Sequence, residues 1–370
     1  MKGYYVFFGT GSVGVRKKIN MQLYELKKIS DIELIEVPYF ERTLWRKIKS
    51  FMPFCSCGFN YHVLYEQIKN PDYLYIRRTT ADKDFYQFLM FIKKKYPACK
   101  IVVEIYTYPY DKDDYNRNIS HHIRMLPYYQ RDCHYRVKLK NVVDRFVTYS
   151  DDDKIFEVDT IKSSNGVSVN DILCHNVKNR KDNILSLVAV AGMQVHHGYE
   201  RLIKGLGKYY KSNPSKIVIF HLVGEGPEIP KYKRLTLQLG LSEYIRFHGK
   251  KIGKELDDIY DESDIAIGSL GLYKYDIYCN STLKVGEYLA KGLPIVSGAY
   301  ISMIEDKMVP FILTLPNDSS DVDINSIISF YKSIYNNTSP VEVATQIRRF
   351  AYEHFDMPIV MKPIIDYLEK

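Results

Sequence analysis

The sequence predicts an α/β protein made of two doubly wound, Rossmann-like domains that face each other across a cleft. Three observations lead to this prediction: the length of 370 residues, the hydrophobic share of 46%, and a regular alternation of short apolar runs with amphipathic segments. That length favours two domains over one, and the hydrophobic share is enough for a large core. Alternating strands and helices are typical of parallel sheets that carry helices on both faces.

The first half contains five short apolar runs that we interpret as buried strands. These runs lie at residues 4–8, 32–37, 73–76, 100–105 and 145–149. Between them, the spacing of apolar residues predicts helices over Val15–Lys28, over residues 85–96 and around Ile119–Val142. This order predicts the first of the two parallel sheets.

The second half repeats the same pattern. Its apolar runs lie at residues 184–190, 216–223, 244–249, 264–270, 293–296 and 310–315. A polar, turn-rich segment at 163–171 is a linker candidate between the halves. We therefore predict an N-terminal domain at residues 1–166 and a C-terminal domain at 167–355. A terminal helix at about 356–370 is a candidate to pack back on the first domain.

The net charge of +8 is concentrated in the first half. Residues 1–165 hold 28 Lys and Arg against 20 Asp and Glu, whereas the remainder holds 24 of each kind. This half is therefore expected to face an anionic partner: nucleic acid, a phosphorylated substrate or an acidic membrane surface. The function predicted below includes no nucleic acid.

Cysteine usage and hydropathy limit the class of protein. The six cysteines are scattered without a C-x-x-C pair, so we expect neither a zinc site nor a disulfide framework. The chain turns to glycine at Gly9, before the apolar region of a signal peptide can form, and no apolar run approaches the roughly 20 residues that span a bilayer. The expected location is the cytoplasm, with the inner face of the plasma membrane as a further site.

A glycine-rich loop follows the first predicted strand. Gly9, Gly11 and Gly14 spell G-x-G-x-x-G, the fingerprint of dinucleotide-binding domains. A dehydrogenase also needs an acidic residue at the end of the second strand, and Glu36 is suitably placed. An NAD(P)-dependent oxidoreductase is therefore one candidate function.

A second phosphate-binding signal lies late in the chain. Ser281 and Thr282 stand where a helix is predicted to begin, over Leu283–Lys291. A helix start offers free N–H groups and the positive end of a dipole, which together suit a diphosphate. Lys284 adds a positive charge in the first turn, and Glu287 lies on the same face and can accept hydrogen bonds from ribose hydroxyls.

Five ordered motifs give the second half a family resemblance. They are SNGVSV (164–169), HHGYERLIKGL (196–206), the stretch from HLVGEGP to RFHGK (221–250), ELDDIYDESDIAIGSL (255–270) and NSTLKVGEYLAKGLPIVSG (280–298). Residues 163–298 resemble the nucleotide-sugar domain of a retaining GT-B glycosyltransferase of family 4. The first half matches that family only in its layout and in the glycine loop.

The resemblance implies roles for individual residues of the second half. The implied donor-binding residues are His197, Gly198, Gly224, Glu225, Gly226, Arg246, Ser281, Thr282, Leu283, Lys284 and Glu287. The family's matching Glu holds the donor ribose, and Arg246 lies near the position where the family seats the base. Lys284, Glu287 and Lys274 are the implied catalytic residues.

Two positions depart from the family's pattern. His197 replaces the usual Lys before glycine, and the Arg expected a few residues earlier is absent. We therefore assign part of the phosphate contact to Lys274 and Lys284. Cys279 replaces the first Glu of the family's E-x7-E pair, of which Glu287 is the second. The contact to the donor sugar is left unassigned.

The first half is predicted to contribute to both substrates. Its glycine loop is expected to turn toward the cleft, as in GT-B enzymes, with Gly11 and Ser12 nearest the diphosphate. The loop after the fourth strand is rich in Tyr and acidic residues, which suit stacking and hydrogen bonding to a sugar. Tyr106, Tyr108 and Asp111 are the predicted acceptor-binding residues.

Residues 43–54 combine cations with large apolar side chains. As a short helix, this segment would bring Trp45, Lys47 and Phe51 to the headgroup level of an anionic bilayer. The alternative is a helix that packs on the sheet with its basic edge in water.

The function predicted from these observations is transfer of a sugar from a nucleotide-sugar donor to a hydroxyl of a glycan or lipid-linked glycan. The resemblance implies retention at the anomeric carbon, UDP as the nucleotide, no metal and no other cofactor, and a role in surface polysaccharide or glycoconjugate synthesis. Three alternatives stay open: the NAD(P)-dependent oxidoreductase, a UDP-sugar epimerase, and a non-catalytic binding module derived from a glycosyltransferase.

Overall fold

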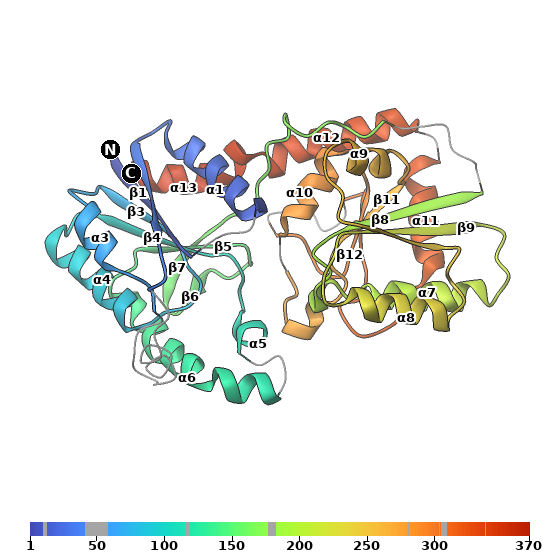
Figure 1. The fold of residues 1–370 in the computed structure, drawn as a ribbon. Coiled ribbons are helices and arrows are strands. Elements are labelled where there is room, and N and C mark those ends of the chain that lie inside the picture. Colours follow the sequence, from blue (N-terminus) through green and yellow to red (C-terminus); the bar gives the residue numbers. More distant parts are fainter. Residues whose placement is uncertain are drawn as a thin grey trace. The chain divides into compact units, whose positions relative to one another are not determined.

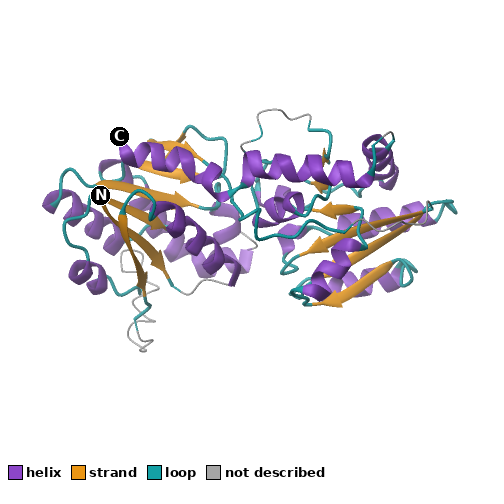
Figure 2. Cartoon of the chain, turned by 90° about the horizontal axis from the view of Figure 1, so that it is seen from above, coloured by secondary structure: helices purple, strands orange, loops and turns teal. Residues whose placement is uncertain are grey.

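The chain divides into two compact α/β units. The computed structural model describes residues 1–9, 13–40, 58–115, 119–176, 183–279, 281–302, 304, 309–336 and 338–370. The first unit comprises Met1–Gly166 with Met357–Lys370, and the second comprises Val167–Asp356 (Figure 1). Within each unit, helices flank the strands of one mainly parallel sheet (Figure 2). The predicted fold class is confirmed.

The described part of the first unit contains a seven-stranded sheet with the order β2-β1-β3-β4-β5-β7-β6. Its strands are β1 (Lys2–Phe8), β2 (Asp31–Val37), β3 (Tyr73–Arg77), β4 (Lys100–Ile105), β5 (Arg145–Thr148), β6 (Lys154–Ile155) and β7 (Val158–Lys162). Its helices are α1 (Val13–Leu26), α3 (His62–Gln67), α4 (Lys83–Lys95), α5 (Asp111–Asp114), α6 (Ile119–Arg136) and α13 (Met357–Glu369). All strand pairs are parallel except β6 with β7.

Side chains of β1 alternate between two hydrophobic cores. Tyr4 and Val6 belong to the core that contains residues of α3, α4 and α6, whereas Tyr5 and Phe7 belong to the core under α1 and α13. A strand whose successive side chains are all buried must be covered on both faces, because they point alternately to opposite sides. Burial on both faces explains why the sequence of β1 is a continuous apolar run.

The described part of the second unit contains a six-stranded parallel sheet with the order β10-β9-β8-β11-β12-β13. Its strands are β8 (Ile184–Val190), β9 (Ile217–Val223), β10 (Ile245–Gly249), β11 (Ile265–Ile267), β12 (Ile295–Ser297) and β13 (Ile312–Thr314). Its helices are α7 (Glu200–Tyr210), α8 (Ile229–Gln238), α9 (Lys254–Asp261), α10 (Leu283–Ala290), α11 (Ile324–Tyr335) and α12 (Pro340–Phe355). The chain runs outward from β8 in one direction and from β11 in the other. Parallel sheets of this kind bind ligands where the strand order reverses, at the carboxyl ends of the strands.

Some elements differ from those predicted. The apolar run at 264–270 forms a strand only over Ile265–Ile267, and Leu270, at the end of the run, bonds to the loop after β8 instead of to a neighbouring strand. The helix predicted around Ile119–Val142 ends at Arg136 and is followed by a 3₁₀ turn, Leu139–Asn141. The sequence analysis also missed the β6–β7 hairpin, whose strands are short and polar.

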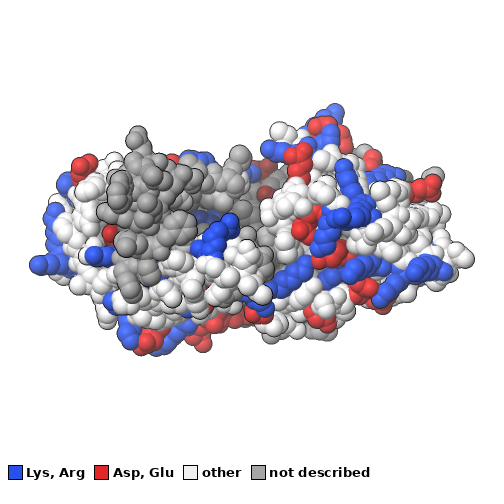
Figure 3. Space-filling model, turned by 60° about the horizontal axis from the view of Figure 1, so that its bottom comes forward, with Lys and Arg blue, Asp and Glu red and all other residues white. Residues whose placement is uncertain are grey.

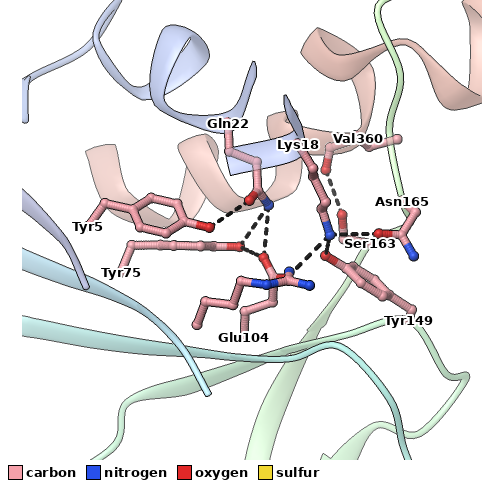
Figure 4. Close-up of polar contacts among 10 residues, drawn as sticks. Tyr5, Lys18, Gln22, Tyr75, Glu104, Tyr149, Ser163, Asn165 and Val360 are labelled. Atoms are coloured by element: carbon pink, nitrogen blue, oxygen red, sulfur yellow. Dashed lines mark hydrogen bonds and ion pairs between the residues drawn. The ribbon is translucent and has the colours of Figure 1, made fainter. Parts of the chain in front are cut away.

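A buried polar network connects α1 to the sheet of the first unit (Figure 4). The carboxylate of Glu104, on β4, accepts hydrogen bonds from the Tyr75 hydroxyl (2.6 Å), from Gln22 Nε2 (2.8 Å) and from Lys18 Nζ (3.3 Å). Arg77, on β3, forms a further ion pair with Glu104. Lys18 Nζ also donates to Asn165 Oδ1 (2.7 Å), next to the end of the first unit.

This network holds two basic side chains and one carboxylate away from water. Lys18 is 1% exposed, Arg77 7% and Glu104 0%. Burial and the nearby charge of Arg77 lower the pKa of Lys18 well below its usual value. The network was not predicted, although a Glu inside the apolar strand KIVVEI is a signal of a paired buried charge.

Replacement of Glu104 tests the importance of this network. Glu104→Ala leaves Arg77 buried without its counter-ion, and we expect the first unit to lose about 3–5 kcal/mol of stability. Urea unfolding followed by far-ultraviolet circular dichroism measures this loss. The control is Glu36→Ala, because Glu36 and Arg16 form a solvent-exposed ion pair (2.7 Å), and little change is expected. Equal effects of the two substitutions would contradict the assignment.

Candidate functional site

The loops after β8 and β11 meet at the carboxyl edge of the second sheet. The Leu270 N–H donates to the His197 carbonyl (2.8 Å), and the Gly271 N–H donates to the His196 carbonyl (3.2 Å). Gly198 has φ +61°, and a Cβ there would lie 2.5 Å from the Gly271 nitrogen, so only glycine allows this approach. The contact brings the predicted residues His197 and Gly198 to the β8–β11 switch point.

Helix α10 begins beside these loops. The Tyr288 hydroxyl, in the second turn of α10, accepts a hydrogen bond from the Val190 N–H (2.9 Å) at the end of β8. Burial lowers the pKa of His197, and the positive charge of Lys284 lowers it further, so the two side chains lie within electrostatic range of each other. The structure therefore brings together Lys284 and His197, which are far apart in the sequence.

The amine of Lys284 is the most unusual group of this site. Its Nζ atom is buried and has no hydrogen-bond partner among the described residues. Burial lowers the pKa of Lys284 to about 7, and the neighbouring Glu287 carboxylate opposes that shift. Because Nζ is unbonded, Lys284 and Glu287 do not form the i,i+3 hydrogen bond of an ordinary surface pair. A buried amine without a partner suits an anionic ligand.

The start of α10 also leaves a hydroxyl available. Thr282 is the N-cap residue, with extended backbone (φ −95°, ψ 151°), and its side chain forms no capping hydrogen bond within the described structure. The Thr282 hydroxyl is buried and unbonded there as well. Ser281 is fully buried, and Leu283 begins the helix. These groups and the N-terminal end of the helix dipole favour negative charge.

His197 is a neutral hydrogen-bond donor rather than a cation. The Gln194 N–H donates to its Nδ1 atom (2.8 Å), so the ring proton resides on Nε2. Burial, the charge of Lys284 and the adjacent His196 all lower the pKa of His197, which keeps the ring neutral at ordinary pH. His197 therefore does not supply the positive charge that a Lys would place there.

Lys274 reaches the same edge of the sheet but is already paired. Its Nζ atom lies 2.5 Å from Glu200 Oε1, at the start of α7, and also donates to the Val195 carbonyl (3.2 Å). Burial raises the pKa of Glu200, but the hydrogen bond and charge of Lys274 outweigh burial, so that the pKa is lowered. Lys274 therefore connects the 3₁₀ turn Leu272–Tyr275 to α7, and its charge is compensated.

Arg201 is a site residue that the sequence analysis missed. It is buried, and its guanidinium donates to the carbonyls of Leu270 (2.7 Å), Ser320 (2.6 Å) and Pro316 (2.9 Å). These bonds hold the loop after β11 in place. Arg201 is the second residue of α7, and an Arg at the start of a helix is usually exposed. The sequence therefore gives little indication of this role.

The glycines after β9 pack against the loop after β8. Gly224 has φ +127°, and a Cβ there would lie 1.9 Å from the Ala191 oxygen; at Gly226, with φ +154°, it would lie 2.3 Å from the Gly192 oxygen. Close approach between two loops thus accounts for both glycines. Glu225 and Arg246 are exposed, and Arg246 lies within β10.

Cys279, which takes the place of the family's first Glu, lies shortly before α10. Its backbone forms an isolated parallel bridge with Tyr300, and the Tyr300 N–H donates to the Tyr278 carbonyl (3.0 Å). The side chain of Cys279 is partly exposed.

The predicted acceptor residues of the first unit have different surroundings. Tyr106 is exposed, with its ring centre 4.4 Å from the Arg77 guanidinium. Tyr108 packs edge-on against Tyr110 and Phe156. The Asp111 carboxylate accepts two hydrogen bonds from Arg136 (2.5 and 3.2 Å). Tyr108 and Asp111 therefore already contact other residues of the first unit.

The glycine loop of the first unit is only partly described. Gly9 has φ +81°, and its N–H donates to the Val37 carbonyl (3.1 Å), whereas Gly11 and Ser12 lie outside the described residues. Glu36, the acid that a dinucleotide site would need, accepts hydrogen bonds from Arg16 through both carboxylate oxygens (2.7 and 3.1 Å). Trp45, Lys47 and Phe51 also lie outside the described residues.

Comparison with known proteins identifies the fold. A glycosyltransferase from Rickettsia africae has 14% sequence identity, 99% of this chain and 98% of that chain covered, and a TM-score of 0.62. HepE from Anabaena, solved in complex with UDP, has 13% identity over 100% of both chains and a TM-score of 0.61. The lipopolysaccharide outer core galactosyltransferase WaaB has 12% identity over 100% and 99% of the chains and a TM-score of 0.59. The chain has the GT-B fold.

The match to a family profile lies in the second unit. Residues 185–327 match the profile of a family described as glycosyl transferases group 1, and this range includes the strands and the α10 start described above. No curated protein matches the sequence. Together, the GT-B fold and the group 1 domain support a glycosyltransferase.

Metal-binding and membrane-spanning features were sought in the described ranges. These ranges contain no group of three or more His, Cys, Asp or Glu residues that could hold a metal ion. No helix within them is long and apolar enough to cross a bilayer.

Replacement of Lys284 by an apolar residue of similar length should stabilise the second unit. Lys284→Met removes a buried amine without a partner, and we expect a gain of about 1–3 kcal/mol, measured at pH 8 by differential scanning calorimetry. The control is Lys291→Met, because the buried Lys291 amine pairs with Asp257 (2.5 Å) and its removal should destabilise the unit. A loss of stability in both variants would show that Lys284 is an ordinary structural residue.

Proposed function

We propose that this chain is a retaining, family 4 glycosyltransferase that uses a nucleotide-sugar donor, with UDP as its nucleotide. The buried, unpartnered amine of Lys284 at the start of α10 is the observation that carries this proposal. The GT-B fold and the group 1 domain support it, and the similar protein HepE has been solved with UDP bound. The acceptor that we propose is a hydroxyl of a glycan or lipid-linked glycan in surface polysaccharide or glycoconjugate synthesis.

The α10 start would stabilise the leaving diphosphate. When the bond between the sugar and the diphosphate breaks, negative charge grows on the phosphate oxygen that leaves. Four groups at the start of α10 could then interact with that oxygen. They are the protonated Lys284 amine, the Nε2–H of His197, the Thr282 hydroxyl and the positive end of the helix dipole. Such preorganised groups lower the barrier because they need no rearrangement as charge develops. We therefore propose leaving-group stabilisation without a metal ion.

Other residues would position the donor. Glu287 lies one turn beyond Lys284 and would accept hydrogen bonds from the ribose hydroxyls. Arg246 and Glu225 would lie toward the base, and Gly11 and Ser12 of the first unit toward the diphosphate. Because Glu200 compensates the charge of Lys274, we propose that Lys274 acts as a positioning residue for the loop after β11.

The acceptor side rests on fewer observations. Tyr106 is the predicted acceptor residue whose ring is exposed, so we propose stacking of the acceptor sugar there. Contact of Trp45, Lys47 and Phe51 with a membrane surface stays a prediction. The engagement of Glu36 by Arg16 disfavours the NAD(P)-dependent alternative, because that carboxylate would have to bind a ribose hydroxyl.

The affinity for UDP should depend on the protonation of Lys284. Binding requires the ammonium form, and the pKa of about 7 means that this form is lost as the pH rises above 7. The diphosphate of UDP keeps its charge across that range. We expect Kd to rise by up to about tenfold per unit between pH 7.5 and 9, measured by titration calorimetry. Lys284→Met should bind weakly without this pH dependence. A constant Kd over the range for the unaltered protein would refute the role of Lys284.

Ribose recognition by Glu287 can be tested separately. Glu287→Ala should weaken UDP binding by about 1.5–3 kcal/mol and reduce turnover severely, because charge-assisted hydrogen bonds to the ribose are lost. The unaltered protein should prefer UDP over 2′-deoxy-UDP, and the variant should lose most of this preference. Glu255→Ala, at an exposed position on α9, is the control. If Glu287→Ala keeps the preference, the ribose contact lies elsewhere.

A further inference from the structure

Asp132 places a carboxyl group inside the first unit. The acidic side chains that are visible in Figure 3 lie at the surface, where water solvates their charge. Asp132, on α6, is only 1% exposed, and no role proposed above uses it. A carboxyl group that leaves water needs hydrogen-bond partners within the protein, because its burial is otherwise costly. The partners of Asp132 therefore indicate its role.

These partners lie on two different loops. The Oδ1 atom of Asp132 accepts a hydrogen bond from the Ala81 N–H (2.6 Å), in the loop between β3 and α4. The Oδ2 atom accepts one from the Tyr110 hydroxyl (2.9 Å), in the loop between β4 and α5. Because β3 and β4 are neighbouring parallel strands, both loops leave the same carboxyl edge of the sheet. The carboxyl group of Asp132 thus joins the two loops at this edge.

The position of Tyr106 depends on both loops. Tyr106 is the first residue after β4, and its ring centre lies 4.4 Å from the guanidinium of Arg77, the last residue of β3. Tyr108 packs edge-on against Tyr110, whose hydroxyl Asp132 binds. We call residues 106–110 the Tyr106 loop. Without the hydrogen bonds of Asp132, this loop would be less firmly held against the end of β3.

The charges around Asp132 are paired with one another. The charged residues beside Asp132 and its two partners are Arg131 and Arg136 on α6, Asp82 beside Ala81, and Asp111 beside Tyr110. Arg136 lies 3.5 Å from Asp132 Oδ2 but 2.5 Å from Asp111 Oδ1. Asp82 pairs with Arg78 (2.6 Å). Asp132 is therefore held mainly by Ala81 and Tyr110.

We propose that Asp132 is a positioning residue, which joins the loops after β3 and β4 and so sets the place of the Tyr106 ring. The inference rests on the proposed function only for the role of Tyr106 in acceptor binding, because the joining of the loops is independent of any substrate. Asp132 acts through Ala81 and Tyr110. A ring that is held in place before the acceptor sugar arrives loses less freedom on binding it.

The joining of the loops should depend on pH. Burial raises the pKa of Asp132 to about 6, although the Ala81 N–H, the charge of Arg136 and the Tyr110 hydroxyl oppose the rise. When the loops open, Asp132 returns to water, where the pKa of an Asp is about 3.9. The joined loops therefore take up a proton more readily than the opened loops as the pH falls through 6. They should open about tenfold less often at pH 5 than at pH 7.5.

Amide hydrogen exchange of the full chain, measured by mass spectrometry, tests the proposal. Asp132→Ala removes both hydrogen bonds, so peptides that cover Ala81 and the Tyr106 loop should exchange at least about tenfold faster at pH 7.5. A peptide from β4 should keep its protection. The control is Asp144→Ala, because Asp144 accepts from the Ile101 N–H (2.6 Å) at the other end of β4, and its loss should leave both loops unchanged.

A conservative variant separates positioning from the filling of space. In Asp132→Asn, the amide oxygen can accept from the Ala81 N–H and the amide N–H can donate to the Tyr110 hydroxyl, so both loops should stay protected. After correction for the intrinsic exchange rate, the unaltered protein should exchange about tenfold more slowly at pH 5 than at pH 7.5 in these loops, and Asp132→Asn should show no such difference. A residue that only fills the core would not give this pH profile.

Three outcomes would overturn the proposal. In the first, the unaltered protein shows no pH dependence at the two loops, or Asp132→Asn shows the same dependence; this comparison decides the matter even where Asp132→Ala does not fold. In the second, folded Asp132→Ala keeps both loops protected. In the third, it loses protection equally in β4. Titration with UDP is run in parallel: failure of the unaltered protein to bind UDP would refute the proposed function and leave the exchange result intact.

Discussion

The chemistry available to the second unit depends on one constraint, the burial of the Lys284 amine without a neutralising partner among the described residues. Such burial is unfavourable, because an amine leaves water without gaining a hydrogen bond. Here it brings the pKa of Lys284 close to neutrality. Glu287 is near enough to influence that pKa, but it does not hydrogen-bond the amine. The unpaired amine lowers the stability of the second unit at this position, and it stays available to bind an anionic ligand.

The three basic side chains at the α10 start differ in how their charge is compensated. Three basic side chains at this edge of the sheet were expected to meet the phosphates, but their states differ. Lys274 is neutralised by Glu200, and His197 is a neutral ring that keeps its proton on Nε2. Lys284 alone of the three has no bonded partner. Arg201 bonds to the loop after β11, and the Gly198–Gly271 contact joins that loop to the loop after β8.

The first unit follows a different principle, because its buried charges are compensated internally. Glu104 gathers Lys18, Arg77 and two neutral donors, and Lys18 extends the network to Asn165 at the end of the unit. This network fixes α1, and with it the chain that leaves the glycine loop. Outside it, the unit exposes the ring of Tyr106.

The sequence by itself determined the fold class, most of the strands and the position of α10. Apolar runs of four to eight residues, such as 73–76 and 184–190, are reliable because a strand buried on both faces is made mostly of apolar side chains. It also placed Lys284 and Glu287 on one helix face, because helical spacing is local. The tertiary structure decided which charges are compensated: the pairs Lys274–Glu200, Asp111–Arg136 and Glu104–Lys18 join residues that are 25 to 86 positions apart. Whether a charged side chain is paired depends on its distance from other charges and on its burial. The local pattern of a sequence shows neither of these.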